Sequence, residues 1–330
     1  MRFLDNVFRE TEEYKVLENA VNKGRFPCMA TGLSAVHKAH LVHSVLVNGD
    51  KNALLLASDE AEAQKLCSDL KAMGTSAVFY PSRDFTFREI EGVSREFEHQ
   101  RIGALYGFMT GQYKVIVACA DGALQYTMPK KVLEKSSVKV KSGAEVSPEK
   151  MAAALLAGGY VRVEQVDGTG QFAVRGGILD FFMPSASQPC RVEFWGDEID
   201  TVSSFDLETQ RRTEQLDEFV ITPSSEIIFD NAEEIAGKIE KKANSLRGKA
   251  ALAAKEVLLK EAEILKNGGR LAGIDKFYSL VYEKAESLFD YLSKDTFVFV
   301  SEMPKHKERM KATVWQWNED IKDYFTDGIL

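Results

Sequence analysis

Cysteine is scarce in this sequence, with four residues in 330. No two of them form a C-x-x-C pair, so neither a disulfide framework nor a zinc site is expected. Three lie in or beside apolar runs typical of helix or strand interiors, where a free thiol packs like a small apolar side chain. We therefore predict buried free thiols rather than cross-links or metal ligands. The four residues are Cys28, Cys67, Cys119 and Cys190.

The sequence also lacks long apolar runs and an excess of basic residues. No run approaches the ~20 apolar residues needed to cross a bilayer. Residues 1–20 form a charged amphipathic pattern unlike a secretory signal, so a cytoplasmic location is expected. The net charge of −8 and the pI of about 5.4 disfavour nucleic acid as a direct ligand. Contact with DNA would need a local basic patch, and isolated pairs such as Lys130 and Lys131 are too short to form one.

Strand-length apolar stretches alternate with helical patterns between about residues 25 and 120. This alternation indicates a parallel sheet covered on both faces. The length of 330 residues also exceeds the usual size of one domain, which predicts two or three domains. The expected strands are residues 26–33, 52–58, 76–82 and 113–120, and the expected helices are residues 34–47, 60–74 and 94–111.

The pattern changes after about residue 130. A helix over 147–159 is followed by short alternating strands with tight turns, which predicts a small antiparallel α+β domain. Helical patterns return from about residue 225 and precede one isolated apolar strand over 296–302 and a final amphipathic helix. Because one strand cannot form a sheet alone, we expect it to return to the first sheet. The expected antiparallel strands are residues 160–166, 171–182, 190–195 and 199–206.

The stretch MATGLSAVHKAHLVHSVL, residues 29–46, looks like a phosphate-binding loop that has lost essential residues. Gly32 stands six positions before Lys38, as in G-x-x-x-x-G-K-[ST]. His37 replaces the second glycine and places a ring where the backbone must approach phosphate. Ala39 replaces the hydroxyl residue that would bind Mg²⁺.

The second half of such a site is an acid at the end of a buried strand, and the late strand offers only Ser301 and Glu302 there. Losing the metal-binding residues of both halves removes the charge neutralisation on which phosphoryl transfer depends. The sequence therefore predicts an inactive site. The loop alone favours a plainer interpretation, a strand, turn and helix with no nucleotide-binding ancestry.

Other clusters of reactive side chains carry less weight. His37, His40 and His43 recur every third residue on an expected helix, but no cysteine or well-placed acid completes a metal site. Solvated or half-buried histidines are the expected outcome. No Ser-His-Asp or Cys-His arrangement is singled out by spacing.

Residues 170–211 closely resemble the inserted domain of the excision-repair protein UvrB, and still more the matching domain of the transcription-repair coupling factor (Mfd) family. The shared pattern runs F-x-V-R-G-x-x-[IL]-D-x-F, then R-[VIL]-[DE]-F-[FW]-x-[DE]-E-[IV]-[DE], then F-D-x-x-[ST]-Q. Looser similarity extends on both sides. The matching residues are Phe172, Val174, Arg175, Gly176, Leu179, Asp180, Phe182, Arg191, Glu193, Phe194, Glu198, Asp200, Phe205, Asp206, Thr209 and Gln210.

This resemblance implies an amino-terminal, UvrB-like region with an α/β fold. A degenerate P-loop domain, RecA- or helicase-like with a parallel sheet, would be interrupted by an inserted antiparallel α+β domain. Its expected parts are residues 1–130, the UvrA-docking insertion over 131–223, and a return to the first domain over 224–330. The resemblance places the ATP-dependent DNA translocase motor outside these residues, so we expect no catalysis and no cofactor here.

The resemblance also implies partners. In this family the inserted domain docks onto UvrA, and the matching positions here are Arg175, Arg191 and Trp195, where the usual last residue is phenylalanine. RNA polymerase and DNA are expected to contact other parts of the full-length protein. UvrB carries a tyrosine-rich hairpin for damage verification where this sequence has a short segment with Phe85 and Phe87, so that activity is not expected.

Strand periodicity supports the docking assignment independently. In CRVEFWG, Val192 and Phe194 fall on one face and Arg191, Glu193 and Trp195 on the other, which should face solvent or a partner. Two arginines and a tryptophan have the composition of an interface hot spot. Two alternatives stay open: the arginines pair with Glu193, Asp197 or Glu198 while Trp195 covers a hairpin, or Lys38 and the Gly32 loop still hold ATP without hydrolysing it.

Overall fold

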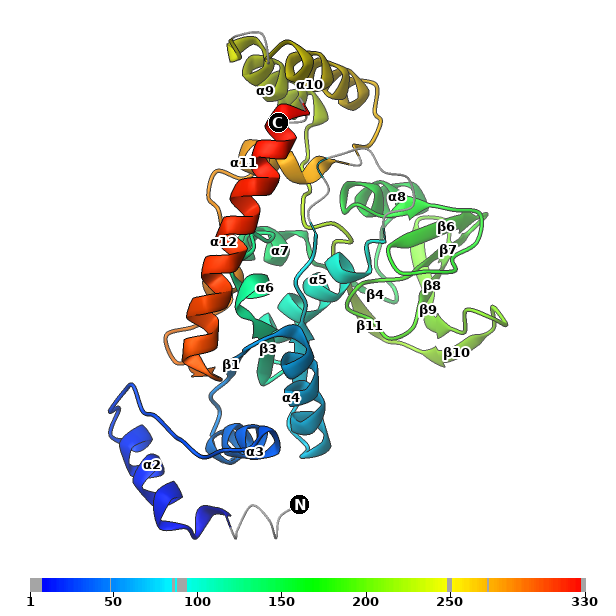
Figure 1. Ribbon diagram of the computed structural model, residues 1–330. Helices are drawn as coiled ribbons and strands as arrows, with labels where there is room; N and C mark the ends of the chain where they lie inside the picture. The colour runs from blue at the N-terminus through cyan, green and yellow to red at the C-terminus, as the bar shows by residue number, and fades with distance from the viewer. Residues whose placement is uncertain are drawn as a thin grey trace. The chain divides into compact units, whose positions relative to one another are not determined.

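The computed structural model describes residues 8–47, 49–84, 87, 94–247, 251–271 and 273–327. The chain divides into two compact units, each assembled from separate stretches of sequence (Figure 1). Unit 1 comprises Met1–Ser82, Gly107–Leu124 and Tyr291–Met310. Unit 2 comprises Arg83–Tyr106, Gln125–Asp290 and Lys311–Leu330. Neither unit is a continuous segment, so residues far apart in sequence meet inside each one.

Unit 1 is built on a four-stranded sheet in the order β12-β1-β3-β2, with all its pairs parallel. Parallel strands buried on both faces are continuously apolar, and β1 and β3 are buried along their whole length. The late strand β12 pairs with β1, Ala53 opposite Phe297, which confirms the predicted return to the first sheet. The strands are β1 (Ala53–Ala57), β2 (Ala77–Tyr80), β3 (Val115–Cys119) and β12 (Phe297–Val300).

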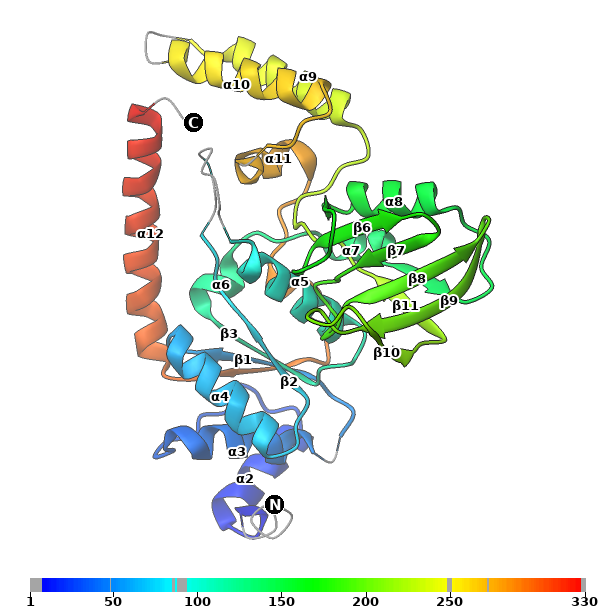
Figure 2. The same cartoon turned by 90° about the vertical axis from the view of Figure 1, so that its right-hand side faces the viewer.

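Helices α3 (Ala35–Leu46) and α4 (Glu60–Ala72) pack their apolar residues with β1, β2 and β3 in one core. Figure 2 shows α4 beside β1 and β2. Asp59 caps α4 by accepting a hydrogen bond from the Glu62 N–H at 2.8 Å, as its sequence position predicts. Helix α2 (Glu12–Asn22) precedes this layer, and the short α6 (Ala120–Leu124) follows β3.

One predicted strand is wrong. Residues 26–33 form no strand in the described structure, and Phe26 and Met29 are exposed. Apolar side chains favour a strand only when a sheet face buries them, and here they have no such face. Pro27 also lacks the N–H that a sheet ladder needs.

Unit 2 contains a six-stranded sheet in the order β10-β9-β8-β7-β6-β5. Helix α8 (Pro148–Ala157) packs onto it around Phe172, Phe181 and Val192, so the predicted antiparallel α+β arrangement is confirmed. The expected strand over 160–166 is reduced to β5, which pairs in parallel with β6. The strands are β5 (Val161–Arg162), β6 (Gln171–Arg175), β7 (Ile178–Phe181), β8 (Cys190–Trp195), β9 (Glu198–Phe205) and β10 (Arg212–Gln215).

The rest of unit 2 is a two-stranded sheet and a set of helices. Strands β4 (Val138–Lys141) and β11 (Glu218–Ile221) pair antiparallel. Helices α9 and α10 pack on each other through a separate apolar core. No helix in the described ranges is long and apolar enough to cross a membrane. The helices are α5 (Glu96–Met109), α7 (Lys130–Ser136), α9 (Ala232–Ser245), α10 (Ala251–Lys266), η1 (Ile274–Phe277), α11 (Tyr278–Val281), η2 (Leu288–Tyr291) and α12 (Met303–Thr326), of which α5, η2 and α12 contribute residues to both units.

A buried ionic network joins distant segments of unit 2. Arg101, which is fully buried, donates to Glu226 at 2.8 Å, and Glu226 also accepts from Arg83 at 2.7 Å. Arg83 in turn donates to both carboxylate oxygens of Asp275 at 3.0 and 2.7 Å. Charges taken out of water are tolerated only when paired in this way. The network therefore ties α5, the segment after β11 and η1 into one unit.

Candidate functional site

Two arginines of unit 2 converge on one buried carboxylate. Asp180 on β7 is 1% exposed and pairs across the sheet with Arg191 on β8. Arg191 donates to it from Nε at 2.7 Å and Nη2 at 2.9 Å. Arg175, the last residue of β6, donates from Nη2 at 2.6 Å. Since two guanidinium groups share one carboxylate, this group of three carries one surplus positive charge.

The Arg191 side chain is more buried than strand periodicity predicts. Its side chain is 12% exposed, whereas that of Arg175 is 47% exposed. Arg191 also donates to the Gln210 carbonyl at 3.1 Å and lies 4.7 Å from the Phe205 ring centre. The hydrogen bonds to Asp180 raise the pKa of Arg191, although partial burial opposes this. Both arginines pair with Asp180 rather than with the acids considered from sequence, and one of those acids, Glu193, pairs with Arg212.

Trp195 is 84% exposed and ends β8, where Gly196 begins the turn with a φ of +62°. Val192 is buried and Phe194 packs against the same core, so the predicted inward face of this strand is confirmed. A large aromatic side chain that covers no core is available to contact another molecule. The face formed by Arg175, Asp180, Arg191 and Trp195 is called the arginine–tryptophan face below.

The loop before α3 lies in unit 1. Gly32 has a φ of +76°, and Ser34 precedes the helix without a side-chain cap. His37 is exposed and lies 3.1 Å from the Ser34 hydroxyl, measured at Nδ1. Ala39 is fully buried in the helix–sheet core. Thus two residues that differ from a working P-loop occupy opposite environments, one in solvent and one in the core.

The structure brings Lys38 together with the residues at the end of β12. Its Nζ donates to the Ser301 hydroxyl at 2.9 Å and to a Glu302 carboxylate oxygen at 2.8 Å. It also donates to Glu62 at 3.1 Å, and Glu62 accepts from Ser301 at 2.8 Å. The Lys38 and Glu62 side chains are 19% and 17% exposed. Lys38, Glu62, Ser301 and Glu302 are called the Lys38 cluster below.

Electrostatics stabilise the charged forms of the Lys38 cluster. Burial alone would raise the pKa of Glu62, but hydrogen bonds from Ser58, Ser301 and Lys38 lower it to about 2. Hydrogen bonding to Lys38 lowers the pKa of Glu302. Burial opposes the charge on Lys38, yet its hydrogen bonds to Glu302 and Glu62 raise its pKa. Two carboxylates thus accept hydrogen bonds from the lysine that would bind phosphate in a working P-loop.

Sequence reasoning missed Glu62 and Asp180. Glu62 stands three positions after the α4 cap residue Asp59, a placement that indicates only a helix start. Asp180 belongs to the repair-protein pattern, but its neighbours in strand β7 do not indicate which basic residues share it. Sequence order alone could not identify either partner.

The remaining sequence candidates fall in ordinary positions. His43 is buried and lies 2.6 Å from the Thr75 hydroxyl, measured at Nδ1. No group of three metal-binding side chains occurs in the part of the chain that the structure describes. Cys67, Cys119 and Cys190 are buried free thiols as predicted, while Cys28 is exposed. Phe85 lies outside the described residues, and the Phe87 ring stands 5.2 Å from that of Tyr324.

Comparison with known protein families identifies a match in unit 2. Residues 138–227 match the UvrB interaction domain, and this segment contains the whole arginine–tryptophan face. This part of unit 2 is therefore similar to the UvrB interaction domain.

The chain as a whole is similar to transcription-repair coupling factors. The Bacillus subtilis (strain 168) protein is 28% identical, over 98% of this chain and 29% of that protein. A Staphylococcus epidermidis protein is 25% identical over 98% of this chain and 27% of its own length, and a Staphylococcus haemolyticus protein is 24% identical over 91% and 26%. The chain is thus a relative of the transcription-repair coupling factors and spans under a third of the length of these three.

Proposed function

We propose that this chain is a non-catalytic, UvrB-like module that binds UvrA and so recruits nucleotide excision repair to stalled RNA polymerase. The observation that carries the proposal is the arginine–tryptophan face within the matched interaction domain. RNA polymerase and DNA would contact other parts of a full-length protein. The proposed organisation keeps residues 131–223 as the docking insertion between residues 1–130 and 224–330.

The proposed contacts divide into two roles. Arg175 and Trp195 are exposed and would touch UvrA directly. Arg191 and Asp180 are largely buried and would hold the Arg175 guanidinium in place. Because Arg175 carries the surplus charge, a carboxylate on the partner would complete the set.

Calorimetric titration of the chain with UvrA tests the proposal, and Arg175→Gln tests the face. We expect the parent to bind and the variant to bind about tenfold more weakly, since a charge-assisted hydrogen bond contributes roughly 1.5–3 kcal/mol. Arg162→Gln is a matched control, because Arg162 is an exposed arginine on neighbouring β5. A folded parent that does not bind UvrA would contradict the proposed function, whereas equal losses in both variants would contradict only the placement of the face.

We further propose that Gly32, His37, Lys38 and Ala39, together with Ser301 and Glu302, are the remains of a nucleotide site on a RecA-like sheet. The Lys38 cluster supports this, since it places the two halves of such a site side by side. It also supports loss of function, since two carboxylates would repel a phosphate group approaching the lysine.

The alternative is a regulatory domain that binds ATP through Lys38 without hydrolysing it. Calorimetric titration of the parent and of Lys38→Met with ATP and Mg²⁺ distinguishes an ATP-binding domain from a site that no longer binds nucleotide. We expect no saturable binding by either protein, because phosphate would have to displace Glu62 and Glu302 from Lys38. Micromolar binding by the parent that is lost in Lys38→Met would establish the alternative.

The Lys38 cluster should also contribute to stability in a pH-dependent way. A carboxyl group whose pKa is lowered on folding stabilises the folded state above its unfolded pKa, and this contribution is lost as pH falls through the folded pKa. For Glu62 the unfolded reference is 4.5 and the folded pKa is about 2. Above pH 5 the free energy of unfolding of the parent should therefore exceed that of Glu62→Gln by up to about 3 kcal/mol. This pH-dependent difference in stability should disappear near pH 2.

Urea unfolding of both proteins between pH 2 and pH 7 measures this difference. Glu234→Gln serves as the control, because Glu234 forms an exposed pair with Lys238 one helical turn away. A difference between parent and Glu62→Gln that does not change with pH would show that Glu62 is not held in its charged form by the fold.

A further inference from the structure

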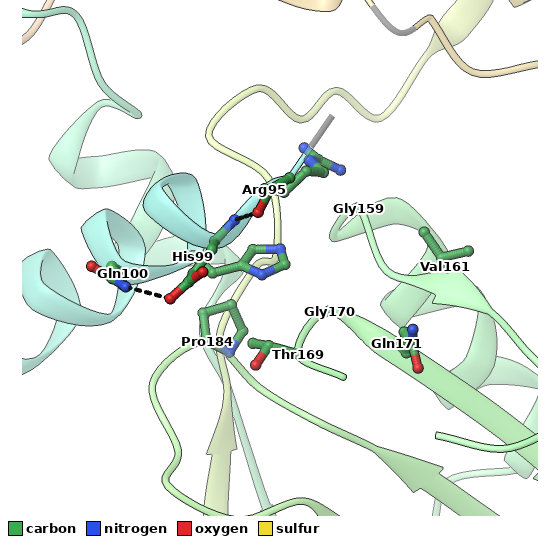
Figure 3. A pocket seen from close by; sticks show the side chains of 11 residues that line it. Arg95, His99, Gln100, Gly159, Val161, Thr169, Gly170, Gln171 and Pro184 are labelled. Atoms are coloured by element: carbon green, nitrogen blue, oxygen red, sulfur yellow. Dashed lines mark hydrogen bonds between the residues drawn. The ribbon is translucent and has the colours of Figure 1, made fainter. Parts of the chain in front are cut away.

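Unit 2 contains a cavity of about 560 Å³ that is separate from the arginine–tryptophan face. Its lining comes from the start of α5 on one side and from residues 159–161 and 169–171 on the other, with Pro184 between them (Figure 3). The volume falls in the range of small-molecule sites. None of the residues used to support UvrA docking lines this cavity.

Two glycines keep the cavity walls in place. Gly170 has a φ of +78°, and a Cβ there would stand 2.7 Å from the His99 ring. Gly159 has a φ of +90°, and a Cβ there would stand 2.6 Å from the Ser225 Cβ. Only glycine adopts these conformations without cost. His99 forms the neutral floor between them, since burial lowers its pKa.

The lining presents several hydrogen-bond donors to the cavity. Arg95 uses Nε for Glu98 and Nη2 for Ser225, and its Nη1 has no partner among the described residues. Gln171 directs its amide oxygen to the N–H groups of Asp167 and Gly168, so its amide nitrogen is left over. The Thr169 hydroxyl also makes no hydrogen bond in the described structure. A ligand that fits this lining must be rich in acceptors.

The charges around the cavity favour an anion. Arg270 does not line the cavity, but it donates to the carbonyls of the lining residue Gly159 and of Tyr160, and it pairs with no carboxylate in the described part of the chain. Its pKa is lowered first by burial and then by repulsion from Arg95. Glu98 accepts from Arg95 Nε through one carboxylate oxygen and from the Glu226 N–H through the other, beside the buried ionic network. Glu96 is the acid in the lining, and it accepts a hydrogen bond from Gln100.

We propose that this cavity binds a phosphate group, with Arg95 supplying the positive charge in the lining and Thr169 and Gln171 the neutral donors. Arg270 adds positive charge from outside the lining, where it donates to the Gly159 carbonyl. A phosphate has three terminal oxygens and nearly two negative charges, which match one guanidinium group and neutral donors from different directions, with a second cation nearby. The remaining volume accommodates a sugar or base, so the class of ligand is a small phosphorylated compound of up to nucleotide size. The same phosphate chemistry could be presented by a nucleic-acid backbone.

Calorimetry with pyrophosphate at constant ionic strength tests this proposal. We expect saturable binding that weakens severalfold in Arg270→Gln, because a positive charge next to the lining is lost. Glu96→Gln should strengthen binding severalfold, because it removes the opposing charge in the lining. Arg247→Gln should have no effect, because Arg247 also donates only to backbone carbonyls but lies on the exposed end of α9.

Two further titrations show which kind of molecule supplies the phosphate and whether it binds in this cavity or at Lys38. Tighter binding of AMP than of pyrophosphate would identify a free nucleotide-sized ligand, whereas preference for a ten-nucleotide single strand with steep salt dependence would identify a nucleic-acid backbone. Lys38→Met should leave binding unchanged, since Lys38 belongs to unit 1. No binding by the folded parent, or binding lost in Lys38→Met but retained in Arg270→Gln, would overturn the proposal.

Discussion

Trp195→Ala is expected to weaken UvrA binding by about 30-fold or more while leaving stability unchanged. An interface hot-spot residue contributes at least ~2 kcal/mol, and each 1.4 kcal/mol is a factor of ten in affinity. Trp195 has the features of such a residue, since its side chain is 84% exposed at the hairpin that joins β8 to β9, on the strand that also carries Arg191. Truncation removes no core contact, so the free energy of unfolding should stay within ~0.5 kcal/mol of the parent.

Calorimetric titration with UvrA measures the affinity, and urea unfolding measures the free energy of unfolding. Trp315→Ala is the matched control, because Trp315 is a 64% exposed tryptophan on α12 in the same unit. Trp195→Phe should retain most of the affinity, since phenylalanine keeps a large aromatic ring at this position. Equal affinity of Trp195→Ala and the parent would remove Trp195 from the interface.

Glu226→Gln is expected to destabilise the protein by about 3–5 kcal/mol, the usual cost of removing one partner from a buried ion pair. Glu226 is 1% exposed and accepts from Arg83, Arg101 and the Thr127 hydroxyl. The glutamine keeps the size of the side chain but removes the charge that compensates the fully buried Arg101. The loss of stability should therefore come from the buried, uncompensated charge of Arg101 rather than from a cavity.

Urea unfolding monitored by circular dichroism checks this value against Lys238→Gln, which breaks an exposed pair and should cost under ~0.5 kcal/mol. Glu98 accepts from the Glu226 N–H beside this network and should stay ionised in moderate acid. Burial would raise the pKa of Glu98, but the charges of Arg95 and Arg83 lower it to about 2. A loss below ~1 kcal/mol in Glu226→Gln would show that the network is not required for the fold.

Most of the architecture could be predicted because it depends on local patterns. Fully apolar strands such as Leu54–Leu56 have few alternatives to a buried parallel sheet. The alternation of Val192 and Phe194 with Arg191 fixed the inward face of β8. The prediction failed at residues 26–33, where apolar composition was present without a surface to bury it.

The arrangement of charges could not be predicted from local patterns. Arg191 was expected on a face turned to solvent or a partner, yet its side chain is largely buried against Asp180 and the Phe205 ring. Glu62 stands 24 residues from Lys38, and Glu226 stands 125 from Arg101. Which ions pair across such separations depends on the completed fold, since Coulomb energy depends on distance in space and on burial. The proposed domain boundaries at residues 130 and 223 stay predictions.

The pairing of β12 with β1 has a consequence for synthesis on the ribosome. Phe297 of β12 follows its partner Ala53 of β1 by 244 residues, which take roughly 12–50 s to translate at 5–20 residues per second. During that interval the edge of β1 that later receives β12 is open, and an open apolar strand edge invites pairing with other chains. Unit 2, whose strands β4 to β11 leave the exit tunnel earlier, can complete its sheets first. The nascent chain would thus depend on chaperones or on rapid translation of its last third to protect an incomplete sheet.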